Sequence, residues 1–168
     1  RNRAETKMSD VKIVEADLAN QEHAVAVLTL VEEFSTDPMG GGSALTSQAR
    51  VALIPGLAAH PTTVLFLAYN DGQAIGVAVC FIGFSTFAAK SLINIHDLFV
   101  RDHARGQGVA SALIEAITQK TRAIGGCKVT LEVQSNNTRA QAVYRAAGFQ
   151  KAVYEEAAGT VIFLTKPL

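Results

Sequence analysis

The sequence predicts an α+β domain: a mixed, mostly antiparallel twisted sheet of six to seven strands, flanked by about four helices on both faces. Strand-like runs and helical periodicities follow one another in the order β, α, α, β, β, β, α, β, α, β, β. This order is neither the strict alternation of a doubly wound fold nor an all-antiparallel sandwich. The 168 residues are 49% hydrophobic and 18% charged, which is typical of one ordered domain with a sizeable core.

The N-terminal part is predicted to form one strand and two helices. Residues 11–16 alternate apolar and polar side chains as a half-buried strand does. Residues 20–34 show helical spacing behind Asn20, a favourable N-cap. After a glycine-containing loop, Ser47 is expected to cap a second helix that runs to about His60, and Pro55 is expected to end or kink it early.

The middle of the chain is predicted to form three consecutive strands. Residues 63–69 and 74–84 are β-rich, and the Asp71-Gly72 dipeptide between them is a strong hairpin signal. Residues 91–100 form the next strand, which is reached through a short turn. These strands are expected to pair in antiparallel fashion.

The C-terminal part is predicted to contain two helices and three strands. Helical patterns run from Gln107 to about residue 124 and from Asn136 to Ala147, and each ends at a glycine. Residues 127–134 alternate as a strand between the two helices. Residues 149–154 and 160–165 are expected to form a terminal antiparallel pair.

The composition bounds the domain count and the classes of partner. One domain is expected over residues 8–168, with residues 1–7 as a vector-derived extension, because Met8 precedes the first strand-like run. Fifteen basic and fifteen acidic residues give a net charge of zero, which argues against nucleic-acid and anionic-membrane partners. Since no run approaches 18 apolar residues, a soluble, cytoplasmic protein is expected, with Cys80 and Cys127 reduced and buried.

A glycine-containing loop joins a predicted strand to a predicted helix at residues 100–110 (VRDHARGQGVA). Glycines let backbone amides approach an anion, and a helix N-terminus adds unpaired N–H groups. The loop is therefore either a phosphate-binding turn or an ordinary strand-to-helix turn. A Rossmann fingerprint is excluded because Ser111 replaces its third glycine, and a P-loop because no Gly-Lys-Ser/Thr follows. No metal-ligand cluster is apparent, so no metal is expected.

Two motifs in the C-terminal half of the chain resemble those of the GNAT superfamily of N-acetyltransferases. Arg105, Gly108 and Ala110 match its Arg/Gln-x-x-Gly-x-Gly/Ala signature, between the strand HDLFV and an amphipathic helix. Downstream, Asn137 lies seven residues before Tyr144, and YRAAGF is similar to the Tyr-x-x-x-Gly-Phe ending of this superfamily. The element order fits the GNAT-like acyl-CoA N-acyltransferase fold, while the N-terminal half resembles the family only in its pattern.

The resemblance implies acetyl-CoA as the donor and CoA as a product. It places the pyrophosphate at the backbone amides of the glycine loop. The pantetheine arm would follow the main chain of strand 91–100, where strand 127–135 splays away from it. Arg139 is a further candidate for a phosphate contact. The implied cofactor-binding residues are Leu98, Phe99, Val100, Arg105, Gly106, Gln107, Gly108, Val109, Ala110 and Asn137.

The chemistry requires a neutral amine, whereas an alkylamine of pKa near 10.4 is only about one part in 10³ deprotonated at pH 7. His96 and Asp97 are the first candidates for the base, with Glu132 and a water relay as alternatives. Strand alternation sends His96 and Asp97 to opposite faces unless a bulge intervenes, and the ordinary imidazole pKa near 6.5 favours His96 slightly. The resemblance implies that Tyr144 protonates the CoA thiolate, or stabilises it by hydrogen bonding alone. A purely structural role is the alternative for each of these side chains.

The resemblance places the acceptor between the loops at residues 37–43 and 84–90. Asp37 is expected to hold an ammonium group, with Met39 in the same loop and Phe84 in an apolar wall. A small primary amine, such as a polyamine, an aminoalkyl compound or an amino-acid-like compound, is favoured because no acidic run would attract a Lys-rich tail. The alternatives are a protein or peptide N-acetyltransferase and a non-catalytic acyl-CoA-binding regulatory module. The resemblance also implies a homodimer.

Overall fold

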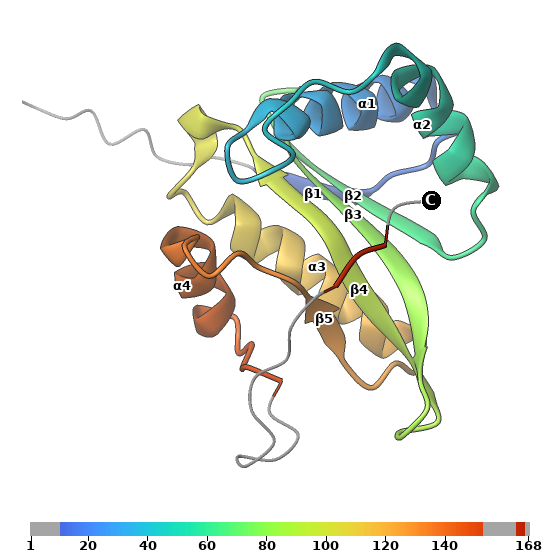
Figure 1. Ribbon diagram of the computed structural model, residues 1–168, viewed down its shortest axis with the longest axis vertical. Coiled ribbons are helices and arrows are strands. Elements are labelled where there is room, and N and C mark those ends of the chain that lie inside the picture. The colour runs from blue at the N-terminus through green and yellow to red at the C-terminus, as the bar shows by residue number, and fades with distance from the viewer. Residues whose placement is uncertain (1–10, 153–163, 167–168) are drawn as a thin grey trace, which may run out of the picture.

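The computed structural model describes residues 11–152 and 164–166, and in this part of the chain a five-stranded sheet lies between two pairs of helices (Figure 1). The strands are arranged in chain order: β1 (Lys12–Glu15), β2 (Thr63–Asn70), β3 (Gln73–Ser85), β4 (Lys90–Val100) and β5 (Val129–Leu131). The helices are α1 (Gln21–Thr36) and α2 (Ser47–Ala59) on one face, and α3 (Val109–Ala123) and α4 (Thr138–Ala146) on the other. The predicted α+β class with helices on both faces is confirmed.

The sheet is antiparallel from β1 to β4 and parallel between β4 and β5. The β2–β3 hairpin has the predicted two-residue turn, in which Asp71 and Gly72 both have positive φ angles, of 48° and 75°. Two positive φ angles define the turn whose twist matches that of the flanking strands. Because α3 connects β4 to β5, these two strands can run parallel.

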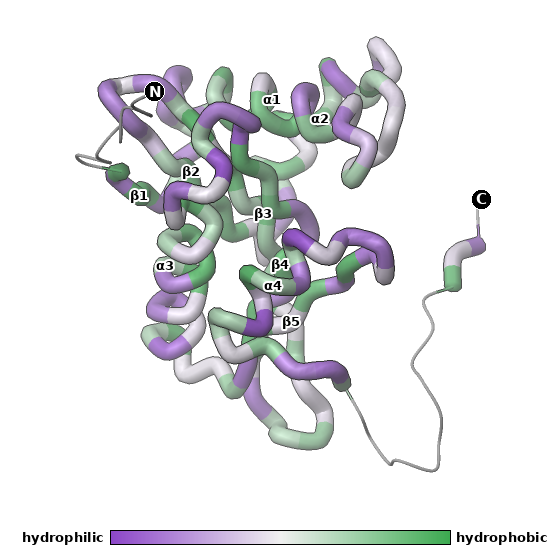
Figure 2. The backbone as a smooth tube through the Cα atoms, turned by 90° about the vertical axis from the view of Figure 1, so that its left-hand side faces the viewer, coloured by the Kyte–Doolittle hydropathy of each residue, from purple (hydrophilic) through white to green (hydrophobic). Residues whose placement is uncertain are grey.

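Each face of the sheet has its own hydrophobic core, and Figure 2 shows that hydrophobic residues follow the strands between the helix layers. The α1/α2-side core contains Val27, Leu30, Leu65, Leu67, Val77, Val79 and Phe99. The α3/α4-side core contains Phe66, Ala78, Cys80, Ile93, Ile95, Leu113 and Ile117, with Tyr144 and Phe149 packed against it. Alternating residues of one strand thus enter different cores, as the pleat requires.

The helix ends follow local chemistry, with one correction to the prediction for α2. Asn20 caps α1 by accepting hydrogen bonds from two amides of the first turn. For α2 the N-cap is Thr46, one residue earlier than predicted, and Pro55 lies inside the helix, which continues to Ala59. Proline leaves the carbonyl of Val51 without its helical donor. Val51 is 75% exposed, so water can satisfy that carbonyl.

The C-terminal part departs from prediction in three ways. The strand β5 has only three residues, against the eight expected over 127–134. The expected strand pair at 149–154 and 160–165 is not seen over 149–152 or 164–165, and its remaining residues lie outside the described part. Cys80 is buried as expected, but Cys127, which lies just before β5, is exposed. Within the described ranges, no helix is long and apolar enough to cross a membrane.

Candidate functional site

A pocket of about 1000 Å³ opens at the sheet edge where β4 and β5 separate. The two strands pair only from Ile93 opposite Val129 to Ile95 opposite Leu131. Beyond Ile95, β4 continues to Val100, while the chain after Leu131 leaves the sheet. The expected separation of these strands is confirmed, and it leaves one edge of β4 facing the pocket.

The glycine loop at the end of β4 presents a row of backbone amides to this pocket. Gly106 and Gly108 have φ angles of 76° and 83°, a conformation that favours glycine, and Gly108 is the N-cap of α3 without a side-chain cap. The first helical hydrogen bond runs from the Ala112 amide to the Gly108 carbonyl, at 3.0 Å. Among the described residues, none accepts a hydrogen bond from the amides of residues 106–111. These amides and the helix dipole therefore form a site for an anion.

The side chain of Arg105 is held by contacts within the protein. Its Nε donates to the Val100 carbonyl at 2.8 Å, and its Nη2 donates to Asp37 Oδ2 at 2.7 Å. Its Nη1 pairs with Asp102 at 2.5 Å, and the guanidinium lies 5.7 Å from the centre of the Phe99 ring. Two carboxylates thus offset its charge, and its Nε and both Nη atoms are engaged by contacts within the protein.

The sequence led us to expect that Asp37 holds an ammonium group. In the structure its carboxylate is instead paired with Arg105. Burial by itself would raise the pKa of Asp37, but hydrogen bonds from Arg105 and from the Met39 amide outweigh burial and lower that pKa. The carboxylate is therefore ionised and already paired. Sequence alone could not reveal this, because the two partners are 68 residues apart.

A β-bulge determines how His96 and Asp97 face the pocket. Val79 on β3 lies opposite Asp97 on β4. The next residue, Cys80, lies opposite Ile95, so His96 is an extra residue on β4. A bulge locally breaks the alternation of side chains between the two faces.

Both side chains consequently lie on the α1/α2 side of the sheet. The ring of His96 meets Phe81, which packs against the α1/α2-side core, with 5.7 Å between the ring centres. Asp97 lies opposite Val79 of the same core. The neighbours on either side, Ile95 and Leu98, belong to the α3/α4 side. The exception expected for a bulge therefore applies, and both side chains share one face of the sheet.

Burial sets the protonation properties of the groups near this bulge. It raises the pKa of Asp97, against an opposing effect of His96, so this carboxylate holds a proton more strongly than an exposed one. It also raises the pKa of the Cys80 thiol to about 12, with a further contribution from Asp97. Cys80 is thus an unreactive core residue, whereas Asp97 is closer than an ordinary aspartate to the range useful for a base.

Tyr144 reaches the pocket from the opposite side, on α4. The helix ends in a Schellman motif, in which the Gly148 amide donates to the backbone carbonyl of Arg145 and the Phe149 amide donates to the backbone carbonyl of Tyr144. Gly148 has a φ angle of 90°, and the turn brings the Phe149 ring edge-on to Tyr144 at 5.8 Å. The Tyr-x-x-x-Gly-Phe pattern is therefore a device that fixes the tyrosine ring. Burial raises the pKa of Tyr144, which keeps its hydroxyl protonated.

The pocket brings together most of the residues singled out in the sequence. Those that line it are Asp37, Met39, His96, Asp97, Leu98, Phe99, Val100, Arg105, Gly106, Gly108, Val109, Ala110, Glu132, Asn137, Arg139 and Tyr144. The Gln107 side chain instead donates to the His103 carbonyl, and Phe84 lies outside the pocket with 64% of its surface exposed.

Sequence reasoning missed several lining residues that carry no motif, including Phe34, Ser111 and Thr138. Phe34 shows only the helical spacing of α1, so no signal marks it as part of a site. Ser111 and Thr138 lie in the first turns of α3 and α4, where an anion site at a helix N-terminus could have pointed to them. In residues 11–152 and 164–166, no three His, Cys, Asp or Glu side chains gather as a metal site.

Curated relatives share sequence with parts of this chain. The N-alpha-acetyltransferase MAK3 of Arabidopsis thaliana is 30% identical over 134 residues, 80% of this chain and 64% of the relative. The uncharacterized N-acetyltransferase YhfO of Bacillus subtilis (strain 168) is 28% identical over 89 residues, 53% of this chain and 60% of the relative. These matches therefore span less than two thirds of the length of either relative.

Solved structures share the fold. A probable acetyltransferase has a TM-score of 0.77 at 21% identity, covering 93% of this chain and 99% of the other. The aminoglycoside acetyltransferase AAC(6')-Iy, solved with a bisubstrate analogue, has a TM-score of 0.74 at 23% identity, covering 95% of this chain and all of the other. The family model described as the acetyltransferase (GNAT) family matches residues 23–149. The chain belongs to the acetyltransferase (GNAT) family.

Proposed function

We propose that this protein is an acetyl-CoA-dependent N-acetyltransferase whose acceptor is a small primary amine. The observation that carries the proposal is the pocket at the β4–β5 separation. It combines an amide-lined anion site, an open strand edge and proton-handling side chains on both sides. Family membership supports the same activity.

The pocket fits the two polar parts of CoA. The amides of residues 106–111 and the N-terminus of α3 suit the pyrophosphate, since fixed N–H donors and a helix dipole favour negative charge. Among the described residues, no strand pairs with this edge of β4 beyond Ile95. Such an edge suits the amides of pantetheine, which can add to a sheet edge as an extended peptide does. Asn137 caps α4 through its Oδ1 and lines the pocket, so its side-chain amide is available to the cofactor arm.

The transfer needs a proton acceptor near the amine and a donor near the sulfur. The amine nitrogen attacks the thioester carbonyl, a C–N bond forms and the C–S bond breaks. The location of His96 and Asp97 together on the α1/α2 side of the pocket supports a role for them in accepting the ammonium proton. The location of Tyr144 on the α3/α4 side supports a role as donor to the departing thiolate. Because burial raises the pKa of Tyr144, hydrogen bonding to the thiolate is favoured over full proton transfer.

Two acceptor classes are weighed. Solved structures of similar fold include aminoglycoside acetyltransferases crystallised with sisomicin and with a neamine-based bisubstrate analogue, which supports a small amine. The match to an N-alpha-acetyltransferase over 80% of this chain keeps protein N-termini as the second candidate. The homodimer and the cytoplasmic location stay predictions, and sedimentation would check the first.

The deciding experiment measures thiol release from acetyl-CoA against a panel of polyamines, aminoalkyl compounds, aminoglycosides, amino acids and peptides. It is run on the wild type, on Tyr144→Phe and on the control Tyr69→Phe. Tyr69 is a partly buried tyrosine outside the pocket. We expect release with small amines and a kcat roughly 100-fold lower in Tyr144→Phe only, with CoA binding retained.

The same experiment separates the alternatives. Release with peptides alone would move the proposal to protein acetylation. Calorimetric CoA binding without release from any acceptor would indicate a non-catalytic binding module. Absence of CoA binding by the wild type would refute the acetyltransferase proposal.

A further inference from the structure

Two parallel ion pairs fasten the end of α1 to the loop that follows β4. Arg101 donates to both carboxylate oxygens of Glu33, at 2.9 and 2.6 Å. Four residues further along both segments, Arg105 donates to Asp37 at 2.7 Å. The two arginines are exposed to a similar degree, 25% for Arg101 and 28% for Arg105, whereas Glu33 is 38% exposed and Asp37 15%. The two pairs are therefore alike in chemistry and location, and they differ in how deeply the carboxylate is buried.

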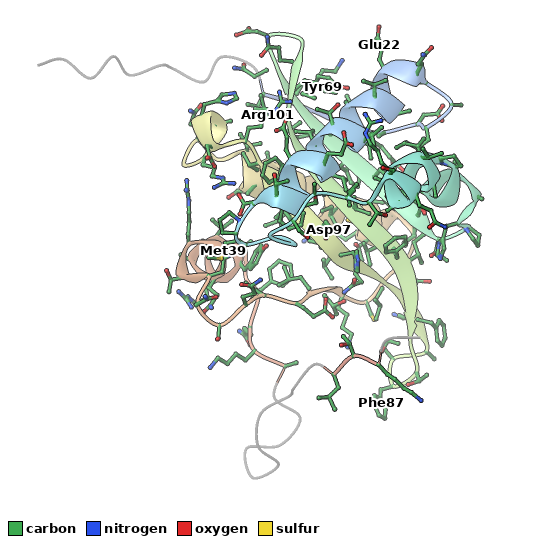
Figure 3. All side chains as sticks on the ribbon, turned by 45° about the horizontal axis from the view of Figure 1, so that its top comes forward. Glu22, Met39, Tyr69, Phe87, Asp97 and Arg101 are labelled. Carbon is green, nitrogen blue, oxygen red and sulfur yellow. The ribbon has the colours of Figure 1, made fainter. Side chains whose placement is uncertain are left out.

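Only the second pair belongs to the functional pocket. Asp37 and Arg105 line it, whereas Glu33 and Arg101 lie outside it. Figure 3 shows Glu22 near the start of α1 and Met39 just past its end, where the loop with Asp37 begins. The Asp37–Arg105 pair thus joins the loop at the end of α1 to the glycine loop at the pocket.

Asp37 organises its own loop at the same time. Its Oδ1 accepts the Met39 amide at 2.8 Å, and its carbonyl accepts the Gly40 amide at 2.9 Å. One carboxylate oxygen therefore shapes the acceptor-side turn, while the other holds Arg105. A displacement of either loop breaks one of these bonds.

Arg105 is equally committed to the protein. It caps the Val100 carbonyl at the end of β4 and precedes Gly106, the first glycine of the loop. With Asp37 and Asp102 beside it, the guanidinium adds no net positive charge for an incoming pyrophosphate. The attraction for that anion then comes from the backbone amides, whose placement depends on where Arg105 is held.

We propose that Asp37 is a positioning residue that, through Arg105, holds the acceptor loop (residues 37–41) and the glycine loop (residues 105–108) as one unit. This inference rests on the proposed function. Cofactor binding at the glycine loop then restrains the acceptor loop further, so acetyl-CoA and the amine bind with positive cooperativity. The coupling is reciprocal, because each ligand must change the affinity of the other by the same factor.

The test compares Asp37→Asn with the matched control Glu33→Gln. Asparagine keeps an oxygen for the Met39 amide but removes the charge that holds Arg105. We expect Asp37→Asn to weaken calorimetric CoA binding roughly tenfold, and to abolish the dependence of acceptor KM on acetyl-CoA concentration. Glu33→Gln loses a comparable amount of thermal stability, yet its CoA affinity and its ligand coupling change less than about twofold.

A double-mutant cycle with Arg105→Gln completes the test. If the pair acts as one unit, the double variant binds CoA no more weakly than either single variant. Tighter CoA binding by Asp37→Asn would overturn the inference, since Asp37 would then be withholding Arg105 from the phosphates. Equal effects of Asp37→Asn and Glu33→Gln would also overturn it, while leaving the proposed acetyltransferase intact. A wild-type protein that binds no CoA would refute both.

Discussion

Replacing Gly108 with alanine separates backbone strain from ligand contact, because the chain offers a matched control in Gly125. Gly108 and Gly125 flank the two ends of α3 with φ angles of 83° and 69°. A Cβ atom added at either position meets no atom within 4 Å. Each alanine variant therefore incurs only the left-handed backbone penalty, about 1–2 kcal/mol. For a chain of this size, 1 kcal/mol lowers Tm by about 2–4 °C.

The two variants differ in what the new methyl group faces. Gly108 lines the pocket and Gly125 does not. A methyl group at Gly108 keeps an anion away from the neighbouring amides. The loss of one charge-assisted hydrogen bond is worth about 1.5–3 kcal/mol, which weakens binding roughly 10- to 150-fold.

The assay combines thermal melts of both variants with calorimetric titration of CoA. The expected result is a similar fall in Tm for both, and weakened CoA binding for Gly108→Ala alone. Wild-type affinity in Gly108→Ala would refute the placement of the pyrophosphate at this helix N-terminus. An equal loss of affinity in Gly125→Ala would show that strain, transmitted along α3, is the cause.

Three further predictions follow from burial. An aromatic disulfide reagent should modify one thiol in the native protein and two after unfolding. The reason is that Cys127 is exposed, while Cys80 is buried and its pKa is raised to about 12. Rapid modification of both thiols in the native state would contradict this prediction. Burial raises the pKa of Asp97, so stability falls as pH rises through that pKa. Asp97→Asn should therefore raise Tm at pH 7, an advantage that disappears below about pH 4, and an unchanged Tm difference across the pH range would count against this. Leu113→Ala should lower the free energy of unfolding, measured by chemical denaturation, by about 3–4 kcal/mol, because Leu113 is fully buried in the α3/α4-side core. A decrease below about 1 kcal/mol would mean that the core collapses around the cavity.

The element order could be predicted from the sequence because its signals are local. Asn20 marks the start of α1, and Asp71 with Gly72 marks the β2–β3 turn, each through contacts only a few residues apart. The glycine loop is likewise encoded within a few residues of α3. These features depend on propensity and capping, which require no knowledge of the rest of the fold.

The arrangement of the site depends on pairings that local signals do not contain. His96 and Asp97 share a face because the register between β3 and β4 slips by one residue, and nothing in β4 itself marks that slip. Asp37 is an isolated acidic residue in sequence, and its role is defined by an arginine 68 positions away. Phe84 looked suitable because of its residue type and loop, but the β3–β4 hairpin carries it away from the pocket.

The early end of β4–β5 pairing also bears on self-association. An unpaired strand edge is a template to which another chain can add, and proteins commonly protect such edges with charges, prolines or bulges. Here the bulge at His96 lies directly after the last paired residue, Ile95, where it distorts the edge. A bound cofactor would occupy the same backbone groups and would stabilise the folded state by mass action. The main-chain groups proposed to bind acetyl-CoA are therefore also the groups that offer a pairing edge to a second chain when no cofactor is bound.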